Sequence, residues 1–411
     1  MERALWNESC CFDVTQYGYV AERSETHTAS IQAAIDSAAA AKGGTVLLPA
    51  GEYLLDASLR LDAPGIAVAG VPRATKITIT DVNLIPFYIS GSANVIRDLE
   101  ITHDQPAPGS VEPWAPKQYQ PTVYIDGASG TLIKDVVFVN PTAAISAKKP
   151  RGLTIEGIRG QPLQSGIQID SADTNVRVQI RDIIFEPFWF SADRRVLAYQ
   201  HRSAIAFSSF SNNFVNVSFE DVTANHYSVG FFFSGNNPAA PFTRQSITKA
   251  KNLDCRLGIL MVGAEERLAV IDYSFRGLGG NASLNCIYIY GSNMTFYCQG
   301  LRCDGTGSSA IQVDGSESSR QMALFNNVFV KDWNQQASGL AETSDEVAAV
   351  SLPPPFDQIE STLSAAAASD VYPAIYAGAG AYVEVSGEKS FFQTPPANWP
   401  IEGGPGNINI V

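Results

Sequence analysis

Charge is scarce in this sequence, and basic charge is the scarcer kind. Charged residues make up 17% of the 411 residues, and 28 Lys and Arg against 41 Asp and Glu leave a net charge of −13. Nucleic-acid backbones and anionic membranes both recruit basic surfaces. We therefore expect neither as the main partner. An acidic polysaccharide stays open, because a local basic patch can override the global sign.

Long apolar runs are absent as well. None reaches the roughly 18 residues that a membrane-spanning helix needs, so we expect no insertion into a membrane. The opening residues, MERALWNESCCFDV, lack the basic region and the apolar core of a secretory signal. These features predict a protein that stays in the cytoplasm or leaves by another route, such as inside a virus particle.

Cysteine is sparse: six residues, without a Cys-x-x-Cys pair. That number is too small for a disulfide scaffold, and we expect reduced, mostly buried thiols that act as small apolar side chains. His201 and His226 are too distant in sequence to form a metal pair by spacing. The sequence therefore predicts neither a metal nor a cofactor.

What the chain does contain is one helix signal followed by many short strands. An Ala-rich stretch from Thr28 places Ile31 and Ile35 four residues apart on one face, and Gly43 and Gly44 end it. The 33 glycines and 23 prolines favour turns and strands elsewhere.

From about residue 65 a pattern of small residue, apolar, any, apolar recurs. Counted at its first apolar position it falls on Ile145, Ile167, Ile205, Phe231, Ile259, Ile287 and Ile311, in steps of 22 to 28 residues except for one of 38. A second, alternating strand lies between these repeats. Such a period indicates a solenoid in which stacked coils bury a common apolar interior. A sandwich would not explain the regular spacing. The predicted fold is all-β, a parallel β-helix.

We divide the chain into three parts. Residues 1–64 form an N-terminal cap with a strand, the helix and a second strand. Residues 65–335 form the parallel β-helix. Residues 336–411 break the rhythm, and Pro353–Pro355 predicts a rigid connection there. Because the open end of a β-helix needs covering, we expect this last part to be a short C-terminal cap or an oligomerisation segment.

The segment FDVTQYGYVAERSETHTASIQAAIDSAAAAKGGTVLLPAGEYLL closely resembles the N-terminal cap of right-handed β-helix proteins of the pectate-lyase superfamily. Their usual G-D-G-x-x-D is replaced here by residues 20–26, which touches the cap rather than a cleft. The resemblance implies a right-handed solenoid with the helix as its cap.

A second likeness covers residues 173–233. DTNVRVQIRDIIFEPFWFSADRR and NVSFEDVTANHYSVGFFF are similar to β-helix modules of bacteriophage tailspikes and prophage tail proteins. Ile184 stands where that pattern has His, while Phe185, Pro187 and Phe188 match. The resemblance implies a homotrimer carried on a virion that binds a bacterial surface polysaccharide and contacts other tail or baseplate proteins.

The marks of the best-known enzymes of the superfamily are missing. The chain has no Asp-Asp dipeptide and no Gly-His-Gly turn, which polygalacturonase-like hydrolases share, and no Tyr-Gly-Phe-Asp-Pro-His, the signature of mannuronan epimerases. No spacing demands the calcium-binding carboxylates of pectate lyases. Standard pectin chemistry is therefore not expected.

Glycoside hydrolysis needs two carboxylates, one as acid and one as base or nucleophile. In GIQID the inward residues should be Ile167 and Ile169, which places Asp170 outside. Glu186 and Asp193 follow in the long step one coil further on, so the three are our catalytic candidates. The alternative is that Asp170 is a turn residue and Glu186 a solvated strand end.

Aromatic rings stack on the apolar faces of sugars, and arginines pair with acidic sugars. Two long insertions carry such residues and could form one groove, or could pack against a second subunit. The first is Thr102–Tyr119 and the second is residues 186–201. The substrate-binding candidates are His103, Asp104, Trp114, Tyr119, Trp189, Arg194, Arg195, Tyr199 and His201.

Three functions remain open from the sequence. The first is a tailspike-like protein that binds and cleaves a bacterial surface glycan. The second is a non-catalytic structural or receptor-binding virion protein. The third is a free bacterial polysaccharide lyase or hydrolase.

Overall fold

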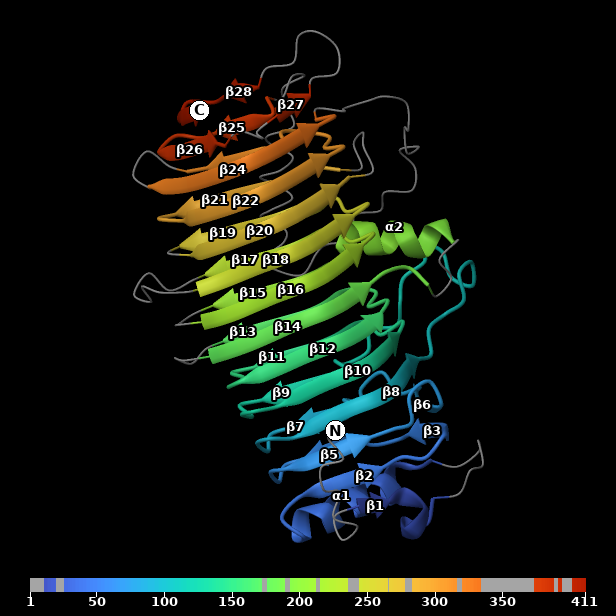
Figure 1. The fold of residues 1–411 in the computed structure, drawn as a ribbon. Coiled ribbons are helices and arrows are strands. Elements are labelled where there is room, and N and C mark those ends of the chain that lie inside the picture. Colours follow the sequence, from blue (N-terminus) through green and yellow to red (C-terminus); the bar gives the residue numbers. More distant parts are fainter. Residues whose placement is uncertain are drawn as a thin grey trace, which may run out of the picture.

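The chain is a right-handed parallel β-helix (Figure 1). The computed structural model describes residues 11–19, 26–171, 176–188, 193–211, 215–235, 244–264, 266–277, 283–315, 320–333, 373–387, 391–393 and 401–411. Within these ranges two sheets made of parallel strands enclose a continuous apolar interior. Trp189 and Pro353–Pro355 lie outside the described residues.

The larger of the two sheets, the long sheet, faces the viewer in Figure 1. Its strands are β1 (Cys11–Asp13), β2 (Gly44–Leu47), β3 (Gly51–Leu55), β5 (Ile66–Ala69), β6 (Thr75–Ile79), β8 (Val95–His103), β10 (Leu132–Val139), β12 (Leu153–Gly160), β14 (Val176–Phe185), β16 (Val215–Asn225), β18 (Arg244–Leu253), β20 (Arg267–Arg276), β22 (Thr295–Asp304), β24 (Gln321–Lys331), β26 (Ala381–Ser386), β27 (Phe391–Gln393) and β29 (Asn407–Ile410).

The short sheet lies behind it and takes one strand from each coil. Its strands are β4 (Leu59–Leu61), β7 (Phe87–Ile89), β9 (Val123–Asp126), β11 (Ala143–Lys148), β13 (Ser165–Ser171), β15 (Ile205–Ser211), β17 (Val229–Gly235), β19 (Leu257–Ala264), β21 (Ile287–Ser292), β23 (Ile311–Asp314), β25 (Ile375–Ala377) and β28 (Glu402–Gly403). From β8 to β24 each coil adds one strand to each sheet, as the periodicity predicts. At the two ends a single coil gives the long sheet two shorter strands, such as β5 and β6, which both pair with β8, and β26 and β27, which both pair with β24.

Register explains the apolar repeat. Ile145 pairs with Ile167, and the series continues through Phe231, Ile259, Ile287 and Ile311, with every member buried. One position of the predicted series is wrong. Ile167 pairs with Phe207, whereas Ile205 pairs with Ser165 two residues earlier. The largest step is therefore two residues longer than the spacing suggested, because AIAFS offers two overlapping apolar pairs.

Each strand of the long sheet from β8 to β24 bends at one residue whose φ is positive. Asp, Asn and Gly tolerate this left-handed conformation best. The pairing stacks these corner residues into a ladder. They are Asp98, Asp135, Gly157, Asp182, Asp221, Lys249, Asp272, Gly300 and Asn327.

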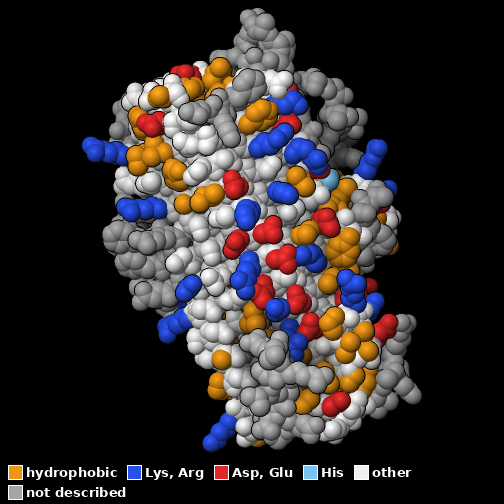
Figure 2. All heavy atoms as spheres, in the orientation of Figure 1, with side chains coloured by type: hydrophobic (Ala, Val, Ile, Leu, Met, Phe, Trp, Pro, Cys, Tyr) orange, Lys and Arg blue, Asp and Glu red, His pale blue; other side chains and the backbone are white. Residues whose placement is uncertain are grey.

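The outer face of the long sheet carries alternating charges, which run up the middle of the molecule in Figure 2. Lys134 and Arg181 both pair with Glu156, while Arg159 pairs with Asp182. Exposed pairs of this kind contribute little stability, roughly 0–1 kcal/mol each. They also leave these charged groups occupied with one another rather than open to a ligand.

Both ends differ from the three-part division. Helix α1 (Thr28–Ala40) closes the N-terminal end, as predicted (Figure 1). A 3-10 helix, η2 (Val14–Tyr17), precedes it and was not predicted. However, β2 already pairs with β5 and β3 with β6, so the coils begin before residue 65. At the other end β25 to β29 pair onto the same two sheets. The described part of residues 336–411 therefore adds further rungs to the solenoid.

A second helix, α2 (Arg194–Ser203), projects from the side of the solenoid (Figure 1) and was not predicted. Asp193 caps it by accepting a hydrogen bond from the Arg195 backbone N–H. Its buried positions Val196, Tyr199 and Ser203 follow helical spacing. The sequence predicts only a long insertion here.

Four of the five described cysteines are buried, as expected. Cys255, Cys286, Cys298 and Cys303 are free and buried, whereas Cys11 is free and exposed. No helix in the described parts of the chain is long and apolar enough to cross a bilayer.

Two glycines test the steric demands of stacking. Gly157 and Gly127 have nearly the same φ, +67° and +65°. A Cβ at Gly157 would lie 2.2 Å from Asp135 Oδ1, whereas a Cβ at Gly127 would meet nothing within 4 Å. Both Ala substitutions impose the same backbone strain, about 1–2 kcal/mol, but only Gly157→Ala must also displace the Asp135 carboxylate of the neighbouring coil. We expect Gly157→Ala to lower the free energy of unfolding by about 1 kcal/mol more in urea denaturation. Equal losses would contradict this.

Candidate functional site

The outer face of the short sheet carries the best candidate site. Side chains alternate along each strand, so one residue in two points away from the interior. As predicted, Ile167 and Ile169 are buried while Gln168 and Asp170 are partly exposed. In the N-terminal half of this sheet the outward residues are polar or aromatic. We call these residues the outer row: Arg60, Asp62, Tyr88, Tyr124, Asp126, Lys148 and Asp170.

Two tyrosines and an arginine stack along the row. The Arg60 guanidinium lies 4.5 Å from the centre of the Tyr88 ring, and the Tyr88 and Tyr124 rings are 5.7 Å apart. The Tyr88 hydroxyl donates to Asp126 Oδ2 over 3.1 Å. Burial raises the pKa of Tyr124, and the negative charges of Asp126 and Asp170 raise it further. Both carboxylates therefore act on the same ring.

Asp126, Lys148 and Asp170 stand on three successive strands at the same register. Adjacent strands are about 4.8 Å apart, so the backbones that carry the two carboxylates are separated by about 9.6 Å. Lys148 lies between them and is exposed, while Asp126 and Asp170 are half-buried. An acid–base pair for inverting glycoside hydrolysis needs carboxyl groups about 6.5–9.5 Å apart. The arrangement can hold a glycosidic bond between two carboxylates.

Sequence reasoning missed Asp126 and Lys148. Both could have been found, because each precedes its equivalent in the next coil by the 22-residue period.

The C-terminal half of the same face is apolar. Val229, Phe232, Leu257, Leu260 and Tyr288 form a buried cluster separate from the interior. At the edge of this cluster the Tyr288 hydroxyl donates a hydrogen bond to Asp314 Oδ2 over 2.9 Å, and Gln312 Nε2 donates to the same oxygen over 2.8 Å. Burial raises the pKa of Asp314. The two hydrogen bonds lower it, but by less than burial raises it. The relation of Tyr288 to Asp314 repeats that of Tyr88 to Asp126.

The structure does not bring the three catalytic candidates into contact. Glu186 follows the end of β14 and is exposed, and Asp193 caps α2. Helix α2 leads into the start of β15, which pairs with the start of β13 at Ser165. Asp170 lies five residues further along β13, about 16 Å from Ser165. Within the described ranges no hydrogen bond or ion pair joins Asp170 to either carboxylate.

The two insertions lie side by side. Trp114 from the first packs edge-on against Tyr199 of α2, with ring centres 5.8 Å apart. Leu163 and Val196 complete this buried cluster. Arg195 Nε also contacts Glu112 Oε1 over 2.7 Å. The two rings are 4% and 5% exposed. They therefore join the insertions to each other instead of offering open faces for a sugar.

Other binding candidates are distributed between surface and interior. Tyr119 is buried and donates to the Asp104 backbone oxygen over 2.6 Å, while the exposed Asp104 carboxylate pairs with Lys117. Arg194 and Arg195 are exposed. Their part in substrate binding stays a prediction.

Burial disfavours the charged form of two candidate histidines. His103 is 1% exposed, and burial lowers its pKa to about 3. Among the described residues its Nδ1 has no hydrogen-bond partner, and its Nε2 lies 3.4 Å from Thr122 Oγ1. Burial, aided by the positive charge of Arg256, likewise lowers the pKa of His201 to about 3. Both rings are therefore neutral at pH 7. No cluster of three or more potential metal ligands occurs among the residues with a described placement.

Comparisons with known proteins establish the fold. No family model matches the chain. Mannuronan C5-epimerase AlgE3 of Azotobacter vinelandii is 57% identical over 42 residues, which make up 10% of this chain and only 2% of that protein. The chain thus matches a small fraction of this curated relative.

Solved structures align over much longer stretches. The Agl-KA catalytic domain superimposes with a TM-score of 0.60 and 15% identity over 100% of this chain and 70% of that one. The exopolygalacturonase of Thermotoga maritima gives 0.52 and 11%, covering 79% and 87% of the two chains. A GH87 α-1,3-glucanase in complex with nigerose gives 0.52 and 13%, covering 82% and 67%. At these identities the likeness shows the parallel β-helix.

Buried neutral histidines make the fold sensitive to acid. The folded pKa of His103, about 3, lies below the unfolded value of about 6.5. The unfolded chain therefore binds more protons between these values, and stability falls as the pH drops below 6.5. Between pH 6.5 and 5 we expect His103→Gln to lose about 2 kcal/mol less unfolding free energy than the wild type. Urea titrations at each pH measure this, and parallel curves would show that His103 titrates normally.

Proposed function

We propose that this protein binds a polysaccharide along the outer row of the short sheet and hydrolyses it between Asp126 and Asp170. The observation that carries this proposal is the pair of half-buried carboxylates two strands apart, with Lys148 between them. Tyr88 and Tyr124 offer partly exposed rings beside that pair, suited to the apolar faces of sugars.

The two carboxylates have different neighbours, which suggests different roles. Asp126 accepts a hydrogen bond from the Tyr88 hydroxyl and is thereby oriented to take a proton from an attacking water. Asp170 then donates a proton to the leaving glycosidic oxygen. Water attacks the anomeric carbon as that bond breaks, so the reaction inverts the anomeric configuration.

Similar structures support a glycan as the partner. Two of the aligned proteins are an exopolygalacturonase and an α-1,3-glucanase in complex with nigerose. The resemblance of residues 173–233 to tailspike modules favours a bacterial surface polysaccharide as the substrate and a virion as the location. A free bacterial lyase or hydrolase is the alternative enzyme.

A non-catalytic receptor-binding protein is the second candidate. It is favoured by Trp114 and Tyr199, whose rings are buried between the two insertions and join them instead of offering their faces to a sugar. In that case replacing Asp170, Glu186 and Asp193 by Ala leaves glycan binding and infectivity intact, and no glycan is cleaved.

Removing either carboxylate of the pair should abolish cleavage. We expect Asp126→Asn and Asp170→Asn each to reduce hydrolysis by about 100-fold or more, since each deletes one proton-transfer group. Asp182→Asn is the matched control, because Asp182 lies on the long sheet and Asn tolerates its left-handed backbone. Reducing-sugar release from a panel of surface glycans measures the rate.

The same assay separates the alternatives. An unsaturated product that absorbs in the ultraviolet would show that the protein is a lyase and not a hydrolase. Release of the same sugar by both Asn variants would remove the pair from the reaction. If the protein binds glycans but cleaves none of them, not even the surface glycan of its own host, the result would favour the non-catalytic protein.

Assembly provides an independent test of the tailspike proposal. Tailspike-like proteins are trimers, so we expect native mass spectrometry to give three times the mass of the chain. The trimer should persist on dilution to nanomolar concentration, because obligate interfaces are large and apolar. A monomer at micromolar concentration would remove this part of the proposal and leave the proposed chemistry standing.

A further inference from the structure

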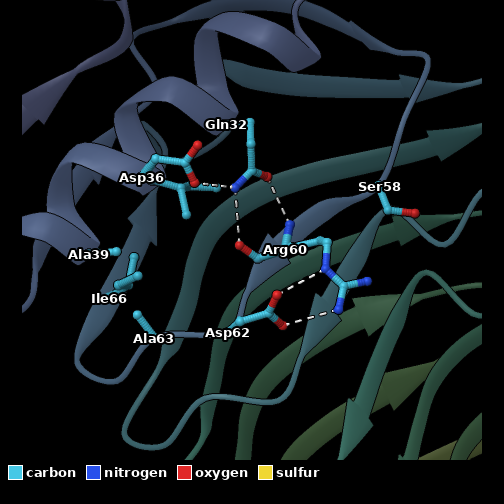
Figure 3. Close-up of a pocket in the computed structure, with 9 residues that line it drawn as sticks. Gln32, Asp36, Ala39, Ser58, Arg60, Asp62, Ala63 and Ile66 are labelled. Atoms are coloured by element: carbon cyan, nitrogen blue, oxygen red, sulfur yellow. Dashed lines mark hydrogen bonds and ion pairs between the residues drawn. The ribbon is translucent and has the colours of Figure 1, made fainter.

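A pocket of about 360 Å³ opens where α1 meets the first strand of the short sheet (Figure 3). This volume falls in the lower part of the range of small-molecule sites, which is about 300–1,000 Å³. Helix α1 forms one wall, and β4 with the turn that follows it forms the other. The pocket therefore lies at the end of the solenoid, outside the carboxylate pair.

The polar rim is held in place by its own hydrogen bonds. Gln32 Nε2 donates to Asp36 Oδ1 over 2.8 Å and to the Arg60 backbone oxygen over 3.3 Å, and Gln32 Oε1 accepts from the Arg60 backbone N–H over 2.9 Å. Arg60 Nε is in turn paired with Asp62 Oδ2 over 2.9 Å. A rim fixed in this way needs little reordering when a ligand binds.

Apart from Ser58, apolar side chains form the rest of the lining. Ala39, Ala63 and Ile66 line the pocket, and the two alanines pack against the interior of the solenoid. A pocket with an apolar wall and a few convergent polar groups is the usual composition of a small-ligand site. It suits a pyranose ring, which has one apolar C–H face and a rim of hydroxyl groups.

The pocket is continuous with the outer row. Arg60 and Asp62 belong to both, since β4 pairs in register with β7, and β7 with β9. The same guanidinium that lines the pocket lies over the Tyr88 ring, and the Ser90 hydroxyl donates to Asp62 Oδ1 over 2.6 Å. A chain of sugars that lies across Tyr124 and Tyr88 reaches this pocket next.

We propose that the pocket binds the terminal sugar of the glycan and selects a neutral one. This inference rests on the proposed function for the path of the glycan, but the pocket itself is separate from the carboxylate pair. Its lining holds two carboxylates, Asp36 and Asp62, against the single cation Arg60, which Asp62 already neutralises. An acidic sugar would be repelled, whereas hydroxyl groups can donate to the carboxylate oxygens.

The test uses the full-length protein and four monosaccharide probes. D-glucose, D-galactose and N-acetyl-D-glucosamine are neutral, and D-glucuronate is acidic. Saturation-transfer difference NMR at millimolar sugar should give a signal with at least one neutral probe and none with glucuronate. Asp36→Trp, which fills the pocket from an exposed position on α1, should weaken that binding by about tenfold or more in Kd.

Two further variants control for misfolding and for the location of the site. Ala33→Trp adds the same ring to an exposed position of α1 that does not line the pocket, and it should bind like the wild type. Ser58→Trp blocks the pocket from the opposite wall and should act like Asp36→Trp. Equal melting temperatures of the three variants show that any loss is local.

The outcomes separate this inference from the proposed function. The neutral-sugar signal should survive in Asp126→Asn/Asp170→Asn, because the carboxylate pair is not part of the pocket. If that double variant loses the signal while Asp36→Trp keeps it, the sugar binds at the pair and the pocket inference is wrong. Stronger binding of glucuronate, or no signal from any probe, would overturn it as well. Failure to cleave any glycan would count against the proposed function alone.

Discussion

The hydrogen bonding of each coil to the next governs this structure. Parallel strands in register place every residue directly over its equivalent in the neighbouring coil, so inward positions stack into one apolar interior and outward positions form continuous rows. The corner ladder from Asp98 to Asn327 keeps this register where the long strands bend. No coil buries its apolar side chains alone, and stability comes from the contacts between coils.

That constraint determines where function can lie. Extra residues leave the solenoid between its strands. Residues 104–120 and α2 both leave where a strand of the long sheet ends and a strand of the short sheet follows, and Trp114 and Tyr199 join them there. Outward side chains, by contrast, are already aligned by the strands. The charges of the long sheet neutralise one another, whereas the outer row of the short sheet holds Asp126, Lys148 and Asp170 in order.

The sequence predicted the fold well because its period is a direct consequence of stacking. The capping helix, the inward Ile167 and Ile169 and the outward Asp170 are all where the pattern placed them. The failures have identifiable causes. Ile205 was misaligned because two apolar pairs overlap in AIAFS, and α2 escaped notice because its apolar face is narrow and its composition polar. Contacts between distant residues, such as Trp114 with Tyr199, leave no local signal, so the burial of these rings could not be foreseen.

Register also makes the proposed chemistry depend on the number of coils between its two carboxylates. Asp126 and Asp170 are separated by the single intervening strand β11. Deleting one coil would bring their strands to about 4.8 Å, close to the spacing of about 5–5.5 Å that supports a covalent, retaining mechanism. Duplicating one would extend the separation to about 14.4 Å, too far for either mechanism. In such a scaffold the stereochemical outcome is not tuned continuously. It changes in whole steps, by the gain or loss of a repeat.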